Sequence, residues 1–225
     1  MKKSPSGGAY VGDIAKLDIQ NMHPRLKEVP IRVMCDVSNP LCGKNGASVV
    51  YGPQKGASSE MVALLDQNLQ RLAERIRIDL ETDVLDIPGG GAAGGVGAAL
   101  VAFCNAELQP GIDVILDLFC FVEKIQDVDL IITGEGKTDF QTAFGKAVSE
   151  VAKRAKPYQK TIVCLSGALG EHIESLYQVG VDCFFSIFPG PITEEQAMSN
   201  AYSYLVDAAE NILRLFIKGR ESKDG

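Results

Sequence analysis

A loop that carries a carboxylate, an amide and a lysine follows an apolar run near the start of the chain. Residues 31–35 are mostly apolar, and Asp36, Asn39 and Lys55 lie in the glycine-containing stretch after them. Glycine lets a loop approach a ligand closely, and loops of this kind often carry binding residues. A carboxylate such as Asp36 accepts a proton or holds Mg²⁺, and a lysine holds a phosphate. The pattern indicates a ligand site, although a surface turn would contain the same residue types.

A second stretch with the same chemistry is residues 134–139, which read Gly-Glu-Gly-Lys-Thr-Asp. We predict a loop between a strand and a helix, the place where open α/β sheets bind ligands and where a helix N-terminus favours phosphate. Glu135 and Asp139 are candidate Mg²⁺ ligands. The stretch is not a P-loop, because that motif needs a glycine where this chain has Ile131. The candidate cofactor-binding residues here are Gly134, Gly136 and Lys137.

A third stretch, residues 89–97, contains six glycines in nine positions. Bare backbone N–H groups in such a loop can wrap an anion. A dinucleotide fingerprint is rejected, because it needs a preceding strand and an acidic residue about 20 positions later, and Glu107 is too near. Close helix packing through glycine and alanine is the alternative. The candidate cofactor-binding residues are Gly89, Gly91, Gly94 and Gly95.

The elements that would position these residues follow from apolar periodicity and turn signals. Strands are predicted at 13–19, 31–35, 128–132, 161–165 and 181–187. Helices are predicted at 60–77 with Ser59 as the N-cap, and at 96–104, 112–124, 140–155, 170–179 and 194–218. Ser166 and Gly167 follow a predicted strand and are expected to form a wall of the cleft.

The order of the elements divides the chain into two predicted domains. From Val128 on, strands and helices alternate as βαβαβα, which favours an α/β domain with a parallel sheet covered by helices. The first half lacks this alternation and is predicted to be mixed. We place the boundary near Gln126, giving domains 1–126 and 127–225. An incomplete parallel sheet exposes an edge strand, so we also expect self-association into a homo-oligomer or poor solubility.

The composition restricts the class of protein. Apolar residues make up 46% of the 225 positions and charged residues 23%, as in soluble globular proteins. A net charge of −7 argues against a nucleic-acid surface. The apolar runs are too short to span a bilayer, and a signal peptide is not recognisable. Six scattered cysteines lack metal-site spacing and fit a reducing cytoplasm.

Three stretches of the chain, in order, resemble signature motifs of the glycerate kinase family, of the bacterial glycerate-2-kinase type. They are residues 36–57 (DVSNPLCGKNGASVVYGPQKGA), 88–100 (PGGGAAGGVGAAL) and 132–139 (ITGEGKTD). The tail, residues 180–215, also fits. Three motifs in the right order are far more specific than any single glycine loop.

The resemblance implies a fold and its relation to a longer chain. It implies a Rossmann-like parallel sheet into which a mixed α+β domain is inserted. In the family an upstream segment adds strands to that sheet, and its Gly-Gly-Ser-Ala-Thr-Asn-Asp-Gly-Gly motif, which has no counterpart in this sequence, lines the active cleft. We expect this chain to correspond to the middle and C-terminal portions, and activity without the upstream segment stays open.

The resemblance also implies an activity, which is ATP-dependent phosphorylation of glycerate to a phosphoglycerate with Mg²⁺. Asp36 and Asn39 would be acceptor-side or metal residues, and Lys55 would contact a phosphate or carboxylate. Residues 134–139 would form a second wall, with Glu135 and Asp139 as Mg²⁺ ligands. Two alternatives stay open: a non-catalytic remnant that binds a small acid or nucleotide, and a kinase of another hydroxy or sugar acid.

Overall fold

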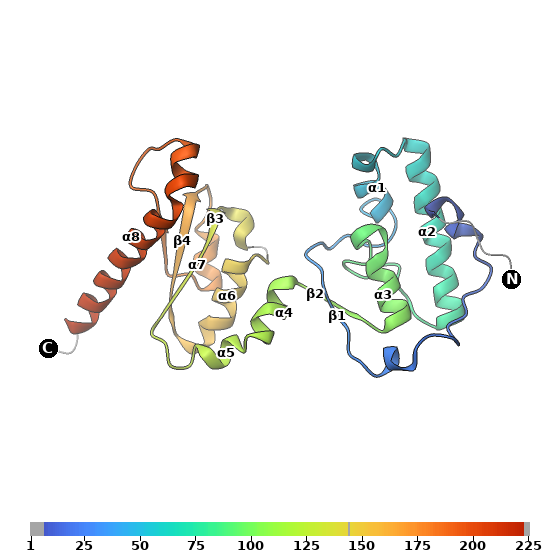
Figure 1. Cartoon of the computed structure of the whole chain (residues 1–225), viewed down its shortest axis with the longest axis horizontal. Coiled ribbons are helices and arrows are strands. Elements are labelled where there is room, and N and C mark those ends of the chain that lie inside the picture. The colour runs from blue at the N-terminus through green and yellow to red at the C-terminus, as the bar shows by residue number, and fades with distance from the viewer. Residues whose placement is uncertain (1–6, 144, 223–225) are drawn as a thin grey trace. The chain divides into compact units, whose positions relative to one another are not determined.

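The computed structural model describes residues 7–143 and 145–222, and the chain forms two compact units, Met1–Val114 and Ile115–Gly225. Figure 1 shows the elements of each unit. The division falls within helix α4 (Gly111–Leu118). In the described part of the chain, no helix combines the length and apolar character needed to cross a bilayer.

The first unit is organised around α2 (Ser59–Leu80), the long helix predicted at 60–77. Its N-cap is Ser58, one residue before the predicted Ser59, because the extended backbone at Ser58 lets the side chain accept the N–H of Met61. The core packs α2 against α3 (Val96–Cys104), which has the predicted bounds. The buried residues of this core are Leu41, Ala73, Ile76, Val84 and Ala98.

The strands of the first unit differ from those predicted. β1 (Arg32–Met34), predicted at 31–35, pairs in parallel with β2 (Glu107–Gln109), whose three residues are too few to show a strand pattern. The predicted strand 13–19 is wrong. Asp13 ends the 3-10 helix η1 (Gly8–Asp13), and residues 14–19 run along α2 with Leu17 N–H bound to Asp79 at 2.7 Å. The remaining short elements are η2 (Pro24–Lys27), α1 (Ala47–Tyr51), η3 (Pro53–Lys55) and η4 (Ala92–Gly94).

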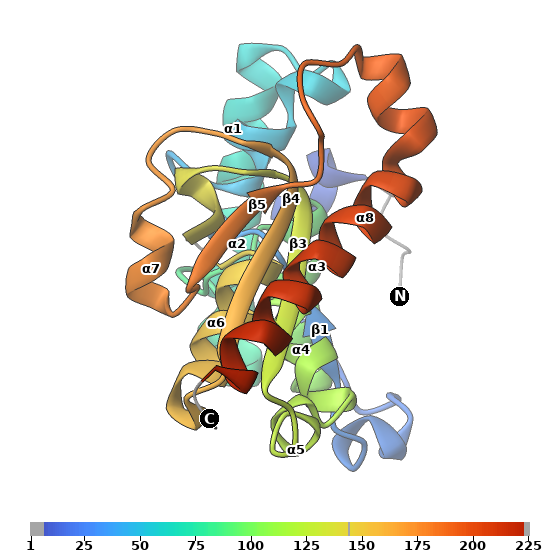
Figure 2. The ribbon, with the colours of Figure 1, turned by 90° about the vertical axis from the view of Figure 1, so that its left-hand side faces the viewer.

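The second unit contains the predicted parallel sheet, in the order β3-β4-β5. The strands are β3 (Leu130–Thr138), β4 (Thr161–Leu169) and β5 (Cys183–Ser186). Helices α6 (Ala147–Ala155) and α7 (Ser175–Val179) lie on one face, and α8 (Glu194–Glu221) lies across the other (Figures 1 and 2). This arrangement is the predicted α/β architecture.

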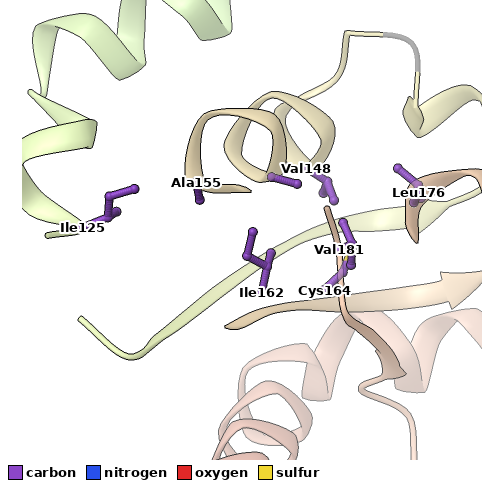
Figure 3. Close-up of a cluster of buried hydrophobic side chains, with 8 residues drawn as sticks. Ile125, Val148, Ala155, Ile162, Cys164, Leu176 and Val181 are labelled. Carbon is purple, nitrogen blue, oxygen red and sulfur yellow. The ribbon is translucent and has the colours of Figure 1, made fainter. Parts of the chain in front are cut away.

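Alternation along β4 explains why both faces are covered. Ile162 and Cys164 point to the α6 side, where Figure 3 shows them beside Val148. Val163 and Leu165 belong to the opposite cluster with Ile212 of α8. Successive strand residues face opposite sides, so a continuously apolar strand serves two cores.

The predicted elements of the second unit have different bounds, and local backbone geometry explains several of them. The predicted helix 112–124 is broken at Cys120 (φ 49°) into α4 and α5 (Phe121–Lys124). The predicted helix 140–155 begins as the 3-10 helix η5 (Phe140–Ala143) before α6, and its position 144 lies outside the described residues. The predicted helix 170–179 begins only at Ser175, after His172 at φ 57°. The 3-10 helix η6 (Lys156–Tyr158) follows α6.

The strands β3 and β4 are longer than predicted, and they include the residues that were expected to form loops after them. Gly134 pairs with Leu165 and Thr138 with Leu169, so the pairing continues through the glycine stretch. A Cβ at Gly134 would collide with the carbonyl oxygen of Leu165. Glycine therefore permits this close strand pairing, and the prediction of a loop at 134–138 is corrected.

Candidate functional site

In the first unit, the loop after β1 packs directly against the glycine stretch 89–97. Gly91 donates its N–H to the carbonyl oxygen of Asn39 at 2.9 Å, and a Cβ at Gly91 would collide with the carbonyl oxygen of Pro40. Gly89 adopts φ +82°, and a Cβ there would lie 2.7 Å from Sγ of Cys35. These glycines serve close packing between the two motifs.

Most of the backbone N–H groups that were predicted to wrap an anion already have hydrogen-bond partners within the protein. The N–H of Gly94 binds the carbonyl of Gly91 at 3.1 Å, and that of Gly95 binds Ala92 at 3.2 Å. With Gly91 bound to Asn39, three of the four glycines named as cofactor contacts use their N–H groups inside the protein. A ligand at this stretch would depend on other groups, so the four assignments stay predictions.

A hollow of about 300 Å³ brings the two motifs of this unit together. The exposed Lys55 and Gly94 both line it, and so does Tyr51. The Tyr51 hydroxyl donates to Oδ1 of Asn39 at 2.8 Å, and Nδ2 of Asn39 donates to the carbonyl of Asn45 at 3.0 Å. Asn39 does not line the hollow, but its hydrogen bond fixes the position of the Tyr51 hydroxyl, and Tyr51 does line it. The other lining residues are Gly8, Ala47, Ser48, Gly52, Gly56, Ala57, Met61, Leu65 and Leu69.

Asp36 has a different environment. Its Oδ1 accepts the N–H of Gly111 at 2.8 Å, at the beginning of α4. A carboxylate is favourable there because the first N–H groups of a helix lack partners within the helix. Asp36 does not line the hollow that contains Lys55. Of the three residues predicted from this motif, Lys55 thus lines the hollow, Asn39 is hydrogen-bonded to its lining residue Tyr51, and Asp36 has neither relation to it.

The thiol of Cys42, in the same loop, has a raised pKa. Burial, followed by the charges of Asp66 and Asp86, raises the pKa of Cys42 to about 12. Gly43, the next residue, donates its N–H to Oδ1 of Asp66 at 3.0 Å. The thiol is therefore protonated at neutral pH and is a poor nucleophile.

In the second unit, a groove of about 570 Å³ lies between the sheet and the first half of α8. Gly134, Glu135 and Gly136 of β3 line it, together with Gly167, which lies within β4 and not after it. The rest of the lining is largely apolar. It comprises Ile132, Thr133, Leu165, Ile187, Phe188, Ala197, Met198, Ala201, Tyr202 and Leu205.

Glu135 is the acidic side chain that lines this groove, and buried hydroxyl groups donate hydrogen bonds to its carboxylate. Oε1 of Glu135 accepts a hydrogen bond from Thr142 at 2.6 Å and another from Thr138 at 3.1 Å. Thr138 also contacts Oγ of Ser166 at 2.6 Å. Both threonines and Ser166 are buried, whereas Glu135 is half-buried.

Lys137 and Asp139 lie at the end of β3. Nζ of Lys137 is 3.9 Å from Oδ2 of Asp139, and Oδ1 of Asp139 accepts the N–H of Gln141 at 2.9 Å. Asp139 therefore begins the turn of η5. Within residues 7–143 and 145–222, no group of three or more His, Cys, Asp or Glu side chains could enclose a metal ion. A Mg²⁺ ion held here would need ligand oxygens or water as well, which is its usual coordination.

Comparison with known proteins assigns the chain to a family. The model of the Glycerate kinase family matches residues 1–217. The chain belongs to the glycerate kinase family. It is 45% identical over 206 residues to the glycerate 2-kinase of Escherichia coli K12 and 43% identical over 206 residues to the glycerate kinase of Halalkalibacterium halodurans. Each match covers 92% of this chain and 54% of the relative, so the chain spans about half the length of these relatives.

A solved structure agrees with this assignment. It comes from Salmonella typhimurium LT2 and carries the provisional name glycerate kinase 2. It is 43% identical to this chain and superposes with a TM-score of 0.82, over 97% of this chain and 56% of its own. The match supports the α/β fold in addition to the family.

Several site residues of this glycerate kinase family member were not singled out from the sequence. Tyr51 braces Asn39, and Thr142 holds Glu135, but neither stands in a recognisable catalytic pattern. Thr138 lies within the glycine motif and Thr142 follows four residues later, which is the only sequence signal for them. Hydroxyl residues after a carboxylate-bearing strand are too common for this signal to be specific.

Proposed function

We propose that this chain catalyses the ATP-dependent phosphorylation of glycerate to a phosphoglycerate. The observation that carries the proposal is that residues 132–136 of the family motif 132–139 form one wall of the groove in the second unit. Relatives named glycerate kinase and glycerate 2-kinase support the choice of substrate. Because they are about twice as long, the proposal concerns the residues that this chain contributes.

The nucleotide is proposed to bind in the groove of the second unit. Phe188 and Tyr202 offer aromatic surface of the kind that small-molecule sites use. Gly134 and Gly136 have no side chains to cover their backbone, and Lys137 supplies a positive charge on a side chain that is 65% exposed. Phosphoryl transfer depends mainly on positioning and on neutralising phosphate charge. This combination suits a triphosphate better than an uncharged ligand.

Glu135 and Asp139 are the residues proposed to hold Mg²⁺. The ion is commonly bound by one or two carboxylates together with substrate phosphates. Oε1 of Glu135 accepts hydrogen bonds from two threonines, and among the described residues Oδ2 of Asp139 has only the 3.9 Å contact with Lys137. When bound, the ion would neutralise the phosphate oxygens. The two carboxylates fit this requirement without a closed protein cage.

Lys55 and Asn39 are proposed to act on the acceptor side. Lys55 provides a positive charge for the carboxylate or phosphate of the acid, at the wall of a hollow that is otherwise mostly apolar. Asn39 is fixed by hydrogen bonds on both polar atoms of its amide and shapes the hollow through Tyr51. Asp36 is proposed as a further acceptor-side or metal residue through Oδ2, since Oδ1 is engaged by Gly111.

A panel of hydroxy acids tests the proposal. ADP formation is measured with Mg²⁺, ATP and glycerate, or with lactate, tartrate or gluconate in place of glycerate. We expect glycerate to be preferred, and Lys55→Met to lose most activity while Lys218→Met, a surface change on α8, loses none. A preference for another acid would replace the substrate, and ATP binding without turnover would favour the non-catalytic alternative.

We also infer that the protein works on a small molecule in the cytoplasm. All six cysteines are free thiols, which fits a reducing compartment. An acidic chain without a basic surface motif offers little to nucleic acid.

A further inference from the structure

The buried hydroxyl groups behind Glu135 form one connected network. Thr138 and Thr142 are both 0% exposed, and both donate to the same carboxylate oxygen, Oε1 of Glu135. Ser166, 1% exposed, extends the network from the neighbouring strand β4. Three polar side chains are thus buried at one point, where an apolar residue would have packed at lower cost. Their common target is the carboxylate that lines the groove.

The direction of each hydrogen bond follows from the single hydrogen on each hydroxyl. Thr138 gives its hydrogen to Glu135, so Ser166 must donate the 2.6 Å bond between Ser166 and Thr138. Thr142 also gives its hydrogen to Glu135 and accepts the N–H of Asp139 at 3.2 Å. The bonds that join Ser166, Thr138 and Thr142 to Glu135 therefore all point toward Oε1, which accepts without donating. The Cys164 thiol adjoins this network, 3.4 Å from Oγ of Ser166. A fully satisfied network of this kind holds its members rigidly.

We propose that Thr138 and Thr142 are positioning residues, which hold Oε1 of Glu135 so that Oε2 is presented to the magnesium–ATP complex in the groove. Among residues 7–143 and 145–222, no hydrogen bond reaches Oε2. Glu135 lines the groove, so its second oxygen is the one that remains for a ligand. The inference rests on the proposed function, because it takes the groove to hold the nucleotide.

Residues that orient a metal-binding carboxylate have measurable effects. Their removal typically lowers metal affinity or activity by about 10–100-fold. The geometry gives Thr142 the shorter of the two hydrogen bonds, 2.6 Å against 3.1 Å for Thr138. Thr142 is therefore expected to have the larger effect.

Paired substitutions at Thr142 separate positioning from packing. Thr142→Val keeps the shape and loses the hydroxyl, whereas Thr142→Ser keeps the hydroxyl and loses a methyl group. We expect Thr142→Val to weaken calorimetric MgATP affinity and to lower kcat/KM for glycerate by about 10-fold or more, and Thr142→Ser to restore both. The control is Ser149→Ala, because Ser149 is equally buried but donates to the carbonyl of Lys146 at 2.8 Å.

The outcomes distinguish this inference from the proposed function. Wild-type MgATP affinity and turnover in Thr142→Val would overturn the inference and leave the function standing. A wild-type chain that does not phosphorylate glycerate, but whose MgATP affinity depends on the Thr142 hydroxyl, would overturn only the function. Absence of MgATP binding would overturn both. If Thr142→Val does not fold, Glu135→Gln decides, because its amide oxygen still accepts both threonine bonds and unchanged MgATP affinity would contradict the inference.

Discussion

The hydroxyl of Tyr51 donates a 2.8 Å hydrogen bond to Oδ1 of Asn39, and this bond joins the loop after β1 to the last residue of α1. Because Asn39 also accepts the N–H of Gly91 through its carbonyl, the bond connects the loop to the glycine stretch as well. Asn39 is thus the residue through which the two family motifs of this unit are connected.

Tyr51→Phe is expected to destabilise the protein by about 1 kcal/mol, the usual contribution of a partly buried hydrogen bond. It is also expected to raise the KM for glycerate, since Asn39 loses its brace. Urea unfolding and steady-state kinetics measure the two effects. The control is Tyr177→Phe, because no hydrogen bond to the Tyr177 hydroxyl occurs in the part of the chain described. Equal stability of the two variants would show that the Tyr51 bond contributes nothing.

Gly91→Ala is expected to destabilise the protein by about 1–3 kcal/mol, the range for overpacking. A Cβ there would collide with the carbonyl oxygen of Pro40 in the facing loop. Gly219→Ala in α8 is the matched control, since no atom lies within 4 Å of the added Cβ and alanine favours a helix. Thermal unfolding compares them, and a Gly91→Ala protein as stable as wild type would contradict the close packing.

Cys42 is expected to resist alkylation at pH 8, because its pKa is raised to about 12 and the thiol keeps its proton. The thiolate fraction is lower than that of an ordinary thiol by roughly 10³-fold. The exposed Cys120 and Cys183 serve as internal controls. Iodoacetamide labelling read by peptide mass spectrometry should show these two modified first. Rapid labelling of Cys42 in the folded protein would refute the assignment.

β3 is an edge strand of its sheet, since β4 is its only partner among the described residues. Unpaired strand edges promote association between chains. Light scattering is therefore expected to detect oligomers of the wild-type chain, and Ile132→Lys, at a position 39% exposed, to reduce them. A stable wild-type monomer across a wide concentration range would rule out this association.

The alternating half of the fold could be predicted from the sequence, whereas the glycine stretch of β3 could not. Apolar runs such as residues 161–165 are buried on both faces, so their pattern indicates a parallel sheet directly. Glycine disfavours strands in general, which is why residues 134–138 looked like a loop. Their strand conformation depends on close approach to Leu165, a contact that is visible only in three dimensions.

The candidate site, too, could be predicted from the sequence only in part. Glu135, Lys55 and Asn39 stand out by residue type and by motif, and each lines or braces a cavity. Thr142 and Ser166 lie 24 residues apart on different elements, and the network that joins them through Thr138 depends on the register of β3 and β4. The sequence does not indicate that backbone carbonyls accept the N–H groups of Gly91, Gly94 and Gly95, because these contacts depend on how the stretch folds.

The most direct test of the central claim is ³¹P NMR of the 225-residue chain with Mg²⁺, ATP and glycerate in one sample. The account predicts a new phosphomonoester signal of a phosphoglycerate, growing as ATP is converted to ADP, and its loss in Glu135→Gln. A spectrum in which no phosphoglycerate appears at high enzyme concentration would contradict it.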